Sequence, residues 1–72
     1  MYTKDEIYNP VHAKISQLFG DLYKGLDKHT ATFDFEDDAQ EFFEYLADAD
    51  GILCRYPVRT GHKCYIVEFK DC

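Results

Sequence analysis

Residues 30–50 read TATFDFEDDAQEFFEYLADAD, and this stretch decides the fold because an alternating pattern leads directly into a helical one. Residues 30–36 alternate polar and apolar side chains, which predicts a half-buried strand. A helix is expected over residues 38–49, with Asp37 as its N-cap and Gln40 closing the capping box. Five apolar residues recur at helical spacing and should form its buried stripe: Ala39, Phe42, Phe43, Leu46 and Ala49.

The segment before this strand predicts another helix. Asn9 is a suitable N-cap, Pro10 fits the first helical position, and Gly25 is suited to the C′ position. Gly20 falls inside this helix, where glycine either costs up to about 1 kcal/mol relative to Ala or permits close packing. The apolar residues that recur at helical spacing are Val11, Ile15, Leu18, Phe19, Leu22 and Leu26.

Residues 52–58 and 63–70 predict a hairpin that turns at Thr60-Gly61. Setting Tyr56 opposite Tyr65 gathers most apolar side chains on one face, and a one-residue slip would scatter them. The expected inner face holds Ile52, Cys54, Tyr56, Val58, Tyr65, Val67 and Phe69. The expected outer face holds Leu53, Arg55, Pro57, Arg59, Cys64, Ile66, Glu68 and Lys70.

These elements predict a single α+β domain over residues 1–72, in the order α-β-α-β-β. We expect a three-stranded mixed sheet in which the last strand lies between the other two, with both helices packed on one face. The predicted core combines aromatic and aliphatic residues from every element: Ile15, Leu18, Leu22, Phe33, Phe35, Phe42, Phe43, Leu46, Tyr56, Val67 and Phe69.

Composition narrows the possible functions. The chain has 72 residues and a formal net charge of −6, which disfavours direct binding to nucleic acid or to an anionic membrane. No apolar run approaches the length of a membrane span, and the N-terminus lacks the apolar stretch of a signal peptide. Three cysteines, an odd number, suit free thiols in the cytoplasm. The expected location is therefore cytoplasmic.

No motif with a known catalytic mechanism occurs, so we expect a protein that is not an enzyme and needs no cofactor. His62 and Cys64 share a strand face, but neither the paired spacing of a zinc site nor a group that would activate the thiol accompanies them. A magnesium site from Asp34, Glu36 and Asp38 is a weaker hypothesis, because the spacing lacks the glycine and terminal Glu of an EF-hand loop. We predict no catalytic and no metal-binding residues.

The charge is concentrated in one block. Residues 30–51 carry eight acids and no Lys or Arg, whereas residues 1–29 are neutral and residues 52–72 have a net charge of +2. Such a block either keeps a small domain in solution or steers a basic partner. The residues expected to bind a partner are Asp34, Glu36, Asp38, Glu41, Glu44, Asp48 and Tyr45, with Tyr45 as an aromatic anchor among the charges.

A second surface is expected on the outer face of the hairpin, from Arg55, Arg59, His62 and Lys70. Charged side chains on an edge hairpin can simply prevent aggregation. They can also frame a second contact surface or a homodimer face built on Leu53 and Ile66.

Residues 32–42, TFDFEDDAQEF, resemble the strand-to-helix junction of split β-α-β sheets, which implies a fold and not a function. By general character the whole chain resembles small phage-encoded host-takeover proteins of the anti-CRISPR or anti-restriction type, which are short, acidic, rich in aromatic residues and without catalytic motifs. That resemblance implies an inhibitor that acts in the cytoplasm of a host cell, and it assigns no functional residues.

These observations together predict a protein-binding module, an inhibitor whose acidic helix face blocks a basic site on a nucleic-acid-handling partner protein. The expected state is a monomer or a weak homodimer. The alternative prediction is a small regulatory or structural subunit that homodimerises through its sheet. A metal-dependent or thiol enzyme is the third hypothesis and the one with least support.

Overall fold

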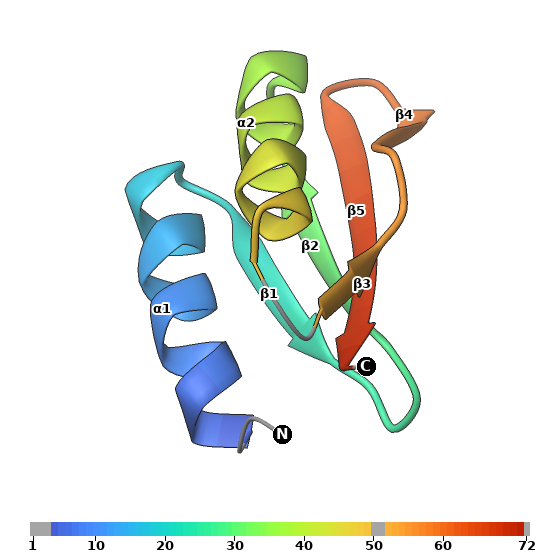
Figure 1. Ribbon diagram of the computed structural model, residues 1–72. Helices are drawn as coiled ribbons and strands as arrows, with labels where there is room; N and C mark the ends of the chain where they lie inside the picture. Colours follow the sequence, from blue (N-terminus) through green and yellow to red (C-terminus); the bar gives the residue numbers. More distant parts are fainter. Residues whose placement is uncertain (1–3, 50–51, 72) are drawn as a thin grey trace.

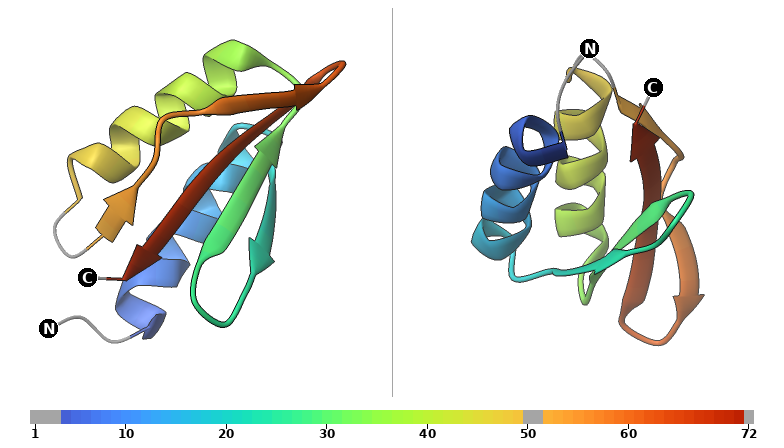
Figure 2. Two further views of the ribbon diagram at one scale, coloured as in Figure 1. Left: turned by 90° about the vertical axis from the view of Figure 1, so that its right-hand side faces the viewer. Right: turned by 90° about the horizontal axis from the view of Figure 1, so that it is seen from below.

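Two helices cover one face of a five-stranded antiparallel sheet (Figures 1 and 2). The computed structural model describes residues 4–49 and 52–71, and the side chains of residues 8–49 and 52–70. The elements, in chain order, are α1 (Lys4–Gln17), β1 (Asp21–Lys24), β2 (His29–Phe33), α2 (Glu36–Ala47), β3 (Ile52–Cys54), β4 (Val58–Gly61) and β5 (Cys64–Asp71).

The sheet confirms the α+β class and extends the predicted topology. The strand order is β1-β2-β5-β3, and β4 also pairs with β5. The last strand therefore lies between β2 and β3, as predicted. The structure has five strands where three were expected. The residues of β1 were predicted as helix, and the strand predicted over residues 52–58 ends at Cys54, with a separate strand, β4, beginning at Val58. Each pairing among the described strands is antiparallel, so the expected mixed sheet is corrected.

Helix α1 begins and ends earlier than predicted. It starts at Lys4 and contains Pro10, which was expected at the first helical position after Asn9. It ends at Gln17 because Phe19 adopts a left-handed conformation, with φ of 59°. The Gly20 amide donates to the Ile15 carbonyl at 2.9 Å and the Phe19 amide to the Ser16 carbonyl at 3.2 Å. These two bonds form a Schellman motif with Phe19, and not Gly25, at C′.

Phe19 gives a first testable prediction, because a bulky side chain in the left-handed region is strained and this one is 90% exposed. Phe19→Gly should raise the free energy of unfolding by about 0.5–1 kcal/mol by removing that strain. As a control, Ala13→Gly in the exposed part of α1 should lower it by about 1 kcal/mol. Urea denaturation measures both. A loss of stability in Phe19→Gly would mean that the Phe19 ring has a packing role.

The chain continues as a β-hairpin where helix was expected. In β1, Leu22 is half-buried while Asp21 and Tyr23 are exposed, which is the alternation of a strand. The Gly25 amide donates to the Lys28 carbonyl at 3.1 Å, and a Cβ on Gly25 would lie 2.3 Å from that oxygen. Gly25 thus ends no helix and instead permits the tight turn between β1 and β2.

His29 is buried at the start of β2. Its ring meets Tyr8 edge-on at 4.7 Å between centroids and lies 5.5 Å from Phe69. Its Nδ1 accepts a hydrogen bond from the Gly25 amide at 3.2 Å, and its Nε2 bonds the Tyr8 hydroxyl. His29 therefore joins α1, the β1–β2 turn and β5, which makes it part of the core.

Helix α2 begins at Glu36, so its N-cap is Phe35 and not Asp37. Phe35 has extended backbone angles and its carbonyl accepts from Ala39 at 3.2 Å. The predicted strand of residues 30–36 accordingly ends at Phe33. Three acidic residues occupy the first turn of α2, where the helix dipole favours negative charge: Glu36, Asp37 and Asp38.

The register of the C-terminal strands differs from the prediction. Cys54 pairs with Phe69 instead of Val67, a shift of two residues that keeps its side chain on the helix-covered face. Val58 pairs with Ile66, a shift of three residues from the predicted register. Because the shift is odd, Val58 lies on the outer face of the sheet and Arg59 on the helix-covered face, the reverse of the prediction. The pairing resumes at Gly61 with Cys64 after a local irregularity, so the turn lies at His62-Lys63 and not at Thr60-Gly61.

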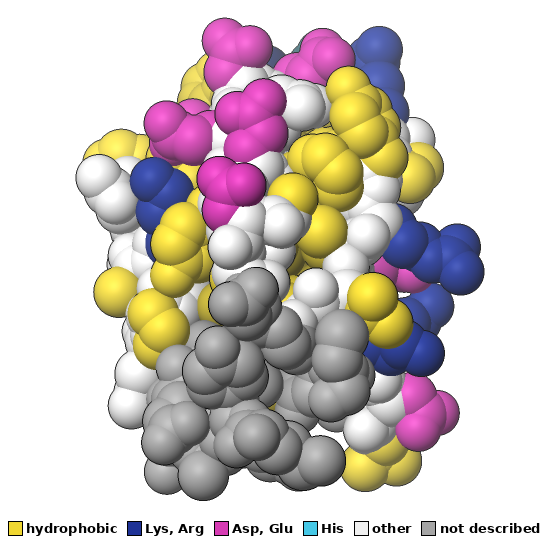
Figure 3. Space-filling model, viewed as in Figure 1, with side chains coloured by type: hydrophobic (Ala, Val, Ile, Leu, Met, Phe, Trp, Pro, Cys, Tyr) yellow, Lys and Arg dark blue, Asp and Glu magenta, His cyan; other side chains and the backbone are white. Residues whose placement is uncertain are grey.

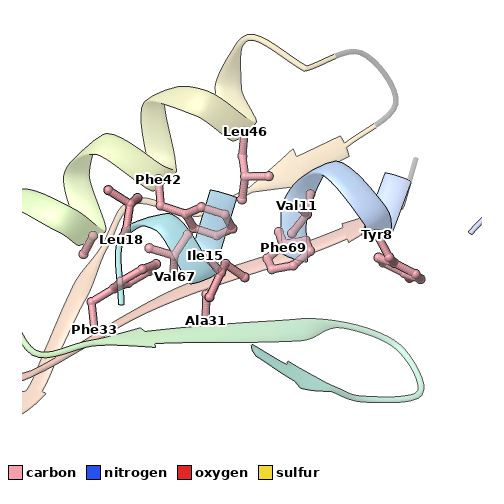
Figure 4. Packing of buried hydrophobic residues seen from close by; sticks show 11 residues of the cluster. Tyr8, Val11, Ile15, Leu18, Ala31, Phe33, Phe42, Leu46, Val67 and Phe69 are labelled. Carbon is pink, nitrogen blue, oxygen red and sulfur yellow. The ribbon is translucent and has the colours of Figure 1, made fainter. Parts of the chain in front are cut away.

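The core lies between the sheet and the two helices (Figure 4). Phe42, from α2, has its ring 5.4 Å from that of Phe33 and 5.9 Å from that of Phe69. Two predicted core residues are instead on the surface, since Phe35 is 63% and Tyr56 66% exposed. The buried apolar residues are Tyr8, Val11, Ile15, Leu18, Ala31, Phe33, Ala39, Phe42, Leu46, Val67 and Phe69.

Candidate functional site

The acidic residues gather over α2, at the upper left of Figure 3. With about 100° between successive residues of a helix, four of them form one solvent-facing ridge, namely Asp37, Glu41, Glu44 and Asp48. All four are exposed, and so are Asp34, just before α2, and Glu36, the first residue of α2. Asp38 is half-buried on the side of α1, and Asp50 lies outside the described residues. We call Asp34, Glu36, Asp37, Glu41, Glu44 and Asp48 the acidic ridge.

The ridge weakens the helix that carries it. Asp37 and Glu41, then Glu41 and Glu44, then Glu44 and Asp48 are neighbours at i,i+3 or i,i+4 spacing, and each such like-charge pair costs about 0.2–0.5 kcal/mol. Among the described residues, the only ion pair to the ridge joins Lys14 Nζ to Glu41 Oε2 at 3.7 Å. The remaining carboxylates of the ridge face solvent without a basic partner from the described residues.

Tyr45 is not the free anchor that the sequence predicted. It is half-buried between α1 and α2, with its ring 6.3 Å from that of Phe42. Lys14 Nζ lies over the same ring at 5.9 Å from its centroid. Tyr45 therefore helps to hold the two helices together, and its replacement would disturb packing as well as the surface.

Two other aromatic residues near α2 are more exposed than Tyr45. Phe35 is exposed at the N-terminal end of α2. Tyr56 is also exposed, and its ring meets that of Phe43 edge-on at 5.2 Å between centroids. Tyr56 also borders a shallow groove of about 170 Å³ between α2 and β4. The groove is lined by Glu36, Gln40, Tyr56, Pro57, Arg59 and Tyr65. Sequence analysis missed this surface because both aromatic residues fitted an apolar strand face.

The predicted second surface is divided between two faces of the protein. Arg55 and Lys70 line a hollow on the outer side of the sheet, together with Lys28. Arg59 instead pairs with Tyr65 and lines the groove beside α2. The register shift of three residues places its side chain on the helix-covered face. His62 is exposed in the turn between β4 and β5. The four residues therefore do not form one site.

The cysteines of the described chain are free thiols on opposite faces of the sheet. Cys54 points to the helix-covered face, where partial burial raises the pKa of its thiol. Cys64 lies on the outer face and its Sγ accepts a hydrogen bond from Thr60 Oγ1 at 3.1 Å. Within residues 4–49 and 52–71, no cluster of three or more His, Cys, Asp or Glu side chains is arranged to hold a metal ion.

Neither helix of the described chain is long and apolar enough to cross a membrane. Comparison with known proteins finds no matching family model, no matching curated protein and no matching solved structure.

Proposed function

We propose that this protein is a non-enzymatic binding module, an inhibitor that places its acidic ridge in a basic site of a partner protein. A site that normally holds nucleic acid is the preferred target, because Lys and Arg side chains line such sites and would pair with carboxylates. The resemblance to phage-encoded inhibitors favours the same class of partner.

The observation that carries the proposal is the unbalanced charge of α2. A ridge that served only for solubility would work as well with interspersed Lys residues, which would also stabilise the helix through i,i+4 pairs. The chain instead keeps six carboxylates together, and within the described residues only Glu41 forms an ion pair, with Lys14. A basic partner would relieve this repulsion on binding.

The exposed aromatic residues supply the apolar contact that charge alone lacks. Phe35 precedes the first turn of α2, where three acids are close together, and Tyr56 lines a groove with Glu36 of that turn. Aromatic anchors that become buried at an interface slow dissociation, whereas the surrounding charges mainly speed association. The two kinds of residue therefore have separable kinetic effects.

The test begins with capture of the partner from lysate of the source cell, followed by binding kinetics with the purified partner. Association should slow as salt rises, because salt screens the carboxylates. A triple reversal, Asp37→Lys with Glu41→Lys and Glu44→Lys, should slow association roughly tenfold or more. Phe35→Ala and Tyr56→Ala should mainly raise the dissociation rate.

A matched control reverses charge on the other face of the sheet. Arg55→Glu with Lys70→Glu should change association less than about twofold, since neither residue borders the acidic ridge. Loss of binding in this control, with binding retained by the triple reversal, would show that the ridge serves only solubility. Salt-independent association would contradict the proposal equally.

Homodimerisation through the sheet is the second candidate function. The observation that favours it is an outer sheet face without a covering helix, on which Tyr23, Leu53 and Val58 are each more than half exposed. Light scattering across protein concentrations separates the two functions. A stable dimer disrupted by Leu53→Glu would support the second, and a monomer throughout would exclude it.

A further inference from the structure

The outer face of the sheet contains a hollow of about 300 Å³ where β3 and β5 meet the β1–β2 turn. Its charged lining comes from three separate segments, with Lys28 from the turn, Arg55 after β3, and Glu68 and Lys70 from β5. Basic side chains gather along the same edge, at the right of Figure 3. This surface lies away from the acidic ridge, so a ligand bound in the hollow would be independent of the proposed inhibitor function.

Glu68 forms ion pairs with two of the three cations. Its Oε2 is 3.3 Å from Lys28 Nζ and 4.0 Å from Arg55 Nε, and its backbone carbonyl accepts from the Arg55 amide at 2.8 Å. The Arg55 side chain is 84% exposed and contacts Glu68 through Nε, so its terminal nitrogens remain available for an anion. Lys70 is exposed and forms no ion pair with any described residue.

The charges of the hollow match a dianion. Three cations and one carboxylate leave a net charge of +2. An arginine fork binds phosphate through two parallel hydrogen bonds, and lysine adds a point charge. Leu53, which is 54% exposed, forms an apolar wall. The volume is at the lower end of the range for ligand sites, and the net charge of −6 on the whole chain disfavours a long polyanion.

We propose that this hollow binds a small phosphate monoester with an apolar body, the phosphate between Arg55 and Lys70 and the body against Leu53. Glu68 lies at the rim of the hollow, where it pairs with Arg55 and Lys28. The ligand class is distinct from the basic protein partner of the acidic ridge.

Titration of the full chain with phenyl phosphate, followed by ¹H–¹⁵N NMR at pH 7.5, tests the proposal. Saturable shifts should be confined to residues 53–55, 68–70 and 28, with a millimolar dissociation constant. Phenol, the neutral analogue, should leave these signals unchanged. Inorganic phosphate should bind more weakly, because it lacks the body that contacts Leu53.

Matched single-charge variants complete the test. Arg55→Gln and Lys70→Gln should each raise the dissociation constant roughly two- to fivefold, whereas Lys63→Gln, in the β4–β5 turn, should leave it nearly unchanged. All three positions are exposed, and unchanged spectra without ligand will show that the variants are folded. Shifts spread over all Lys and Arg residues, equal effects of the three variants, or equal affinity for inorganic phosphate would overturn the proposal.

Discussion

Phe42→Ala is expected to lower the free energy of unfolding by about 3–5 kcal/mol, the usual cost of removing a buried phenylalanine. Phe42 is fully buried, and its ring contacts Phe33 of β2, Phe69 of β5 and Tyr45 of its own helix. Domains of this size have stabilities near the lower end of about 5–15 kcal/mol, so much of the variant should be unfolded at 25 °C. Urea denaturation followed by circular dichroism measures the change.

The neighbouring residue provides the control. Phe43 is only partly buried and its aromatic neighbour is the exposed Tyr56, so Phe43→Ala should cost about 1–2 kcal/mol. Equal losses in the two variants, or a larger loss at Phe43, would mean that α2 presents a different face to the sheet.

Gly20→Ala is expected to destabilise the protein by about 1–3 kcal/mol, as an overpacked core does. A Cβ on Gly20 would lie 2.3 Å from Phe33 Cε1 and 2.6 Å from Cδ1. Phe33 cannot easily move, because its ring is buried between the helices and the sheet. Thermal unfolding monitored by circular dichroism should show a clearly lower midpoint.

Gly61 is the matched control for Gly20. A Cβ on Gly61 would have only Cys64 Cβ nearby, at 4.0 Å, so Gly61→Ala should change stability by less than about 0.5 kcal/mol. A Gly20→Ala variant as stable as Gly61→Ala would show that Phe33 can rearrange to accept the methyl group. The hypothesis that Gly20 serves close packing would then fail.

Local patterns predicted the centre of the fold well. The alternation of Ala31 and Phe33 gave β2, and the helical spacing of Ala39, Phe42 and Leu46 gave α2, each with its buried face. The position of β5 between β2 and β3 followed from the order of elements. In these segments the spacing of the apolar residues fitted only one type of secondary structure, a strand for β2 and a helix for α2.

Elsewhere two structures suited the same residues. Leu18, Leu22 and Leu26 are spaced four apart and extend a helical pattern, although the chain turns at Phe19 and Leu26 is fully exposed. A phenylalanine in the left-handed conformation is rare, so no local signal marked the end of α1. Strand register depends on pairing across the sheet. The register shift that reverses the faces of Val58 and Arg59 therefore could not be predicted from either strand alone.

Most of the acidic ridge was predictable because charge on a helix face depends only on helical geometry, although the exposed residue is Asp37 and the predicted Asp38 is half-buried. The apolar contacts beside it were not, since the exposure of Phe35 depends on where β2 ends and that of Tyr56 on the break between β3 and β4. Tyr45 was misplaced for a related reason, because the approach of Lys14 from α1 covers its ring. The tertiary neighbours of α2 therefore determine which aromatic residues are exposed beside it.

The central strand β5 comes later in the chain than every strand with which it pairs. While the ribosome is still adding the residues before Cys64, the nascent chain can form the β1–β2 hairpin and its helices, but β3 and β4 have no partner strand. Apolar surfaces of α2 and β2 that β5 later covers are exposed during that interval. The sheet therefore assembles only after β5 has been made, when a single segment joins three strands at once. A nascent chain stalled before that point would offer its uncovered surface to chaperones.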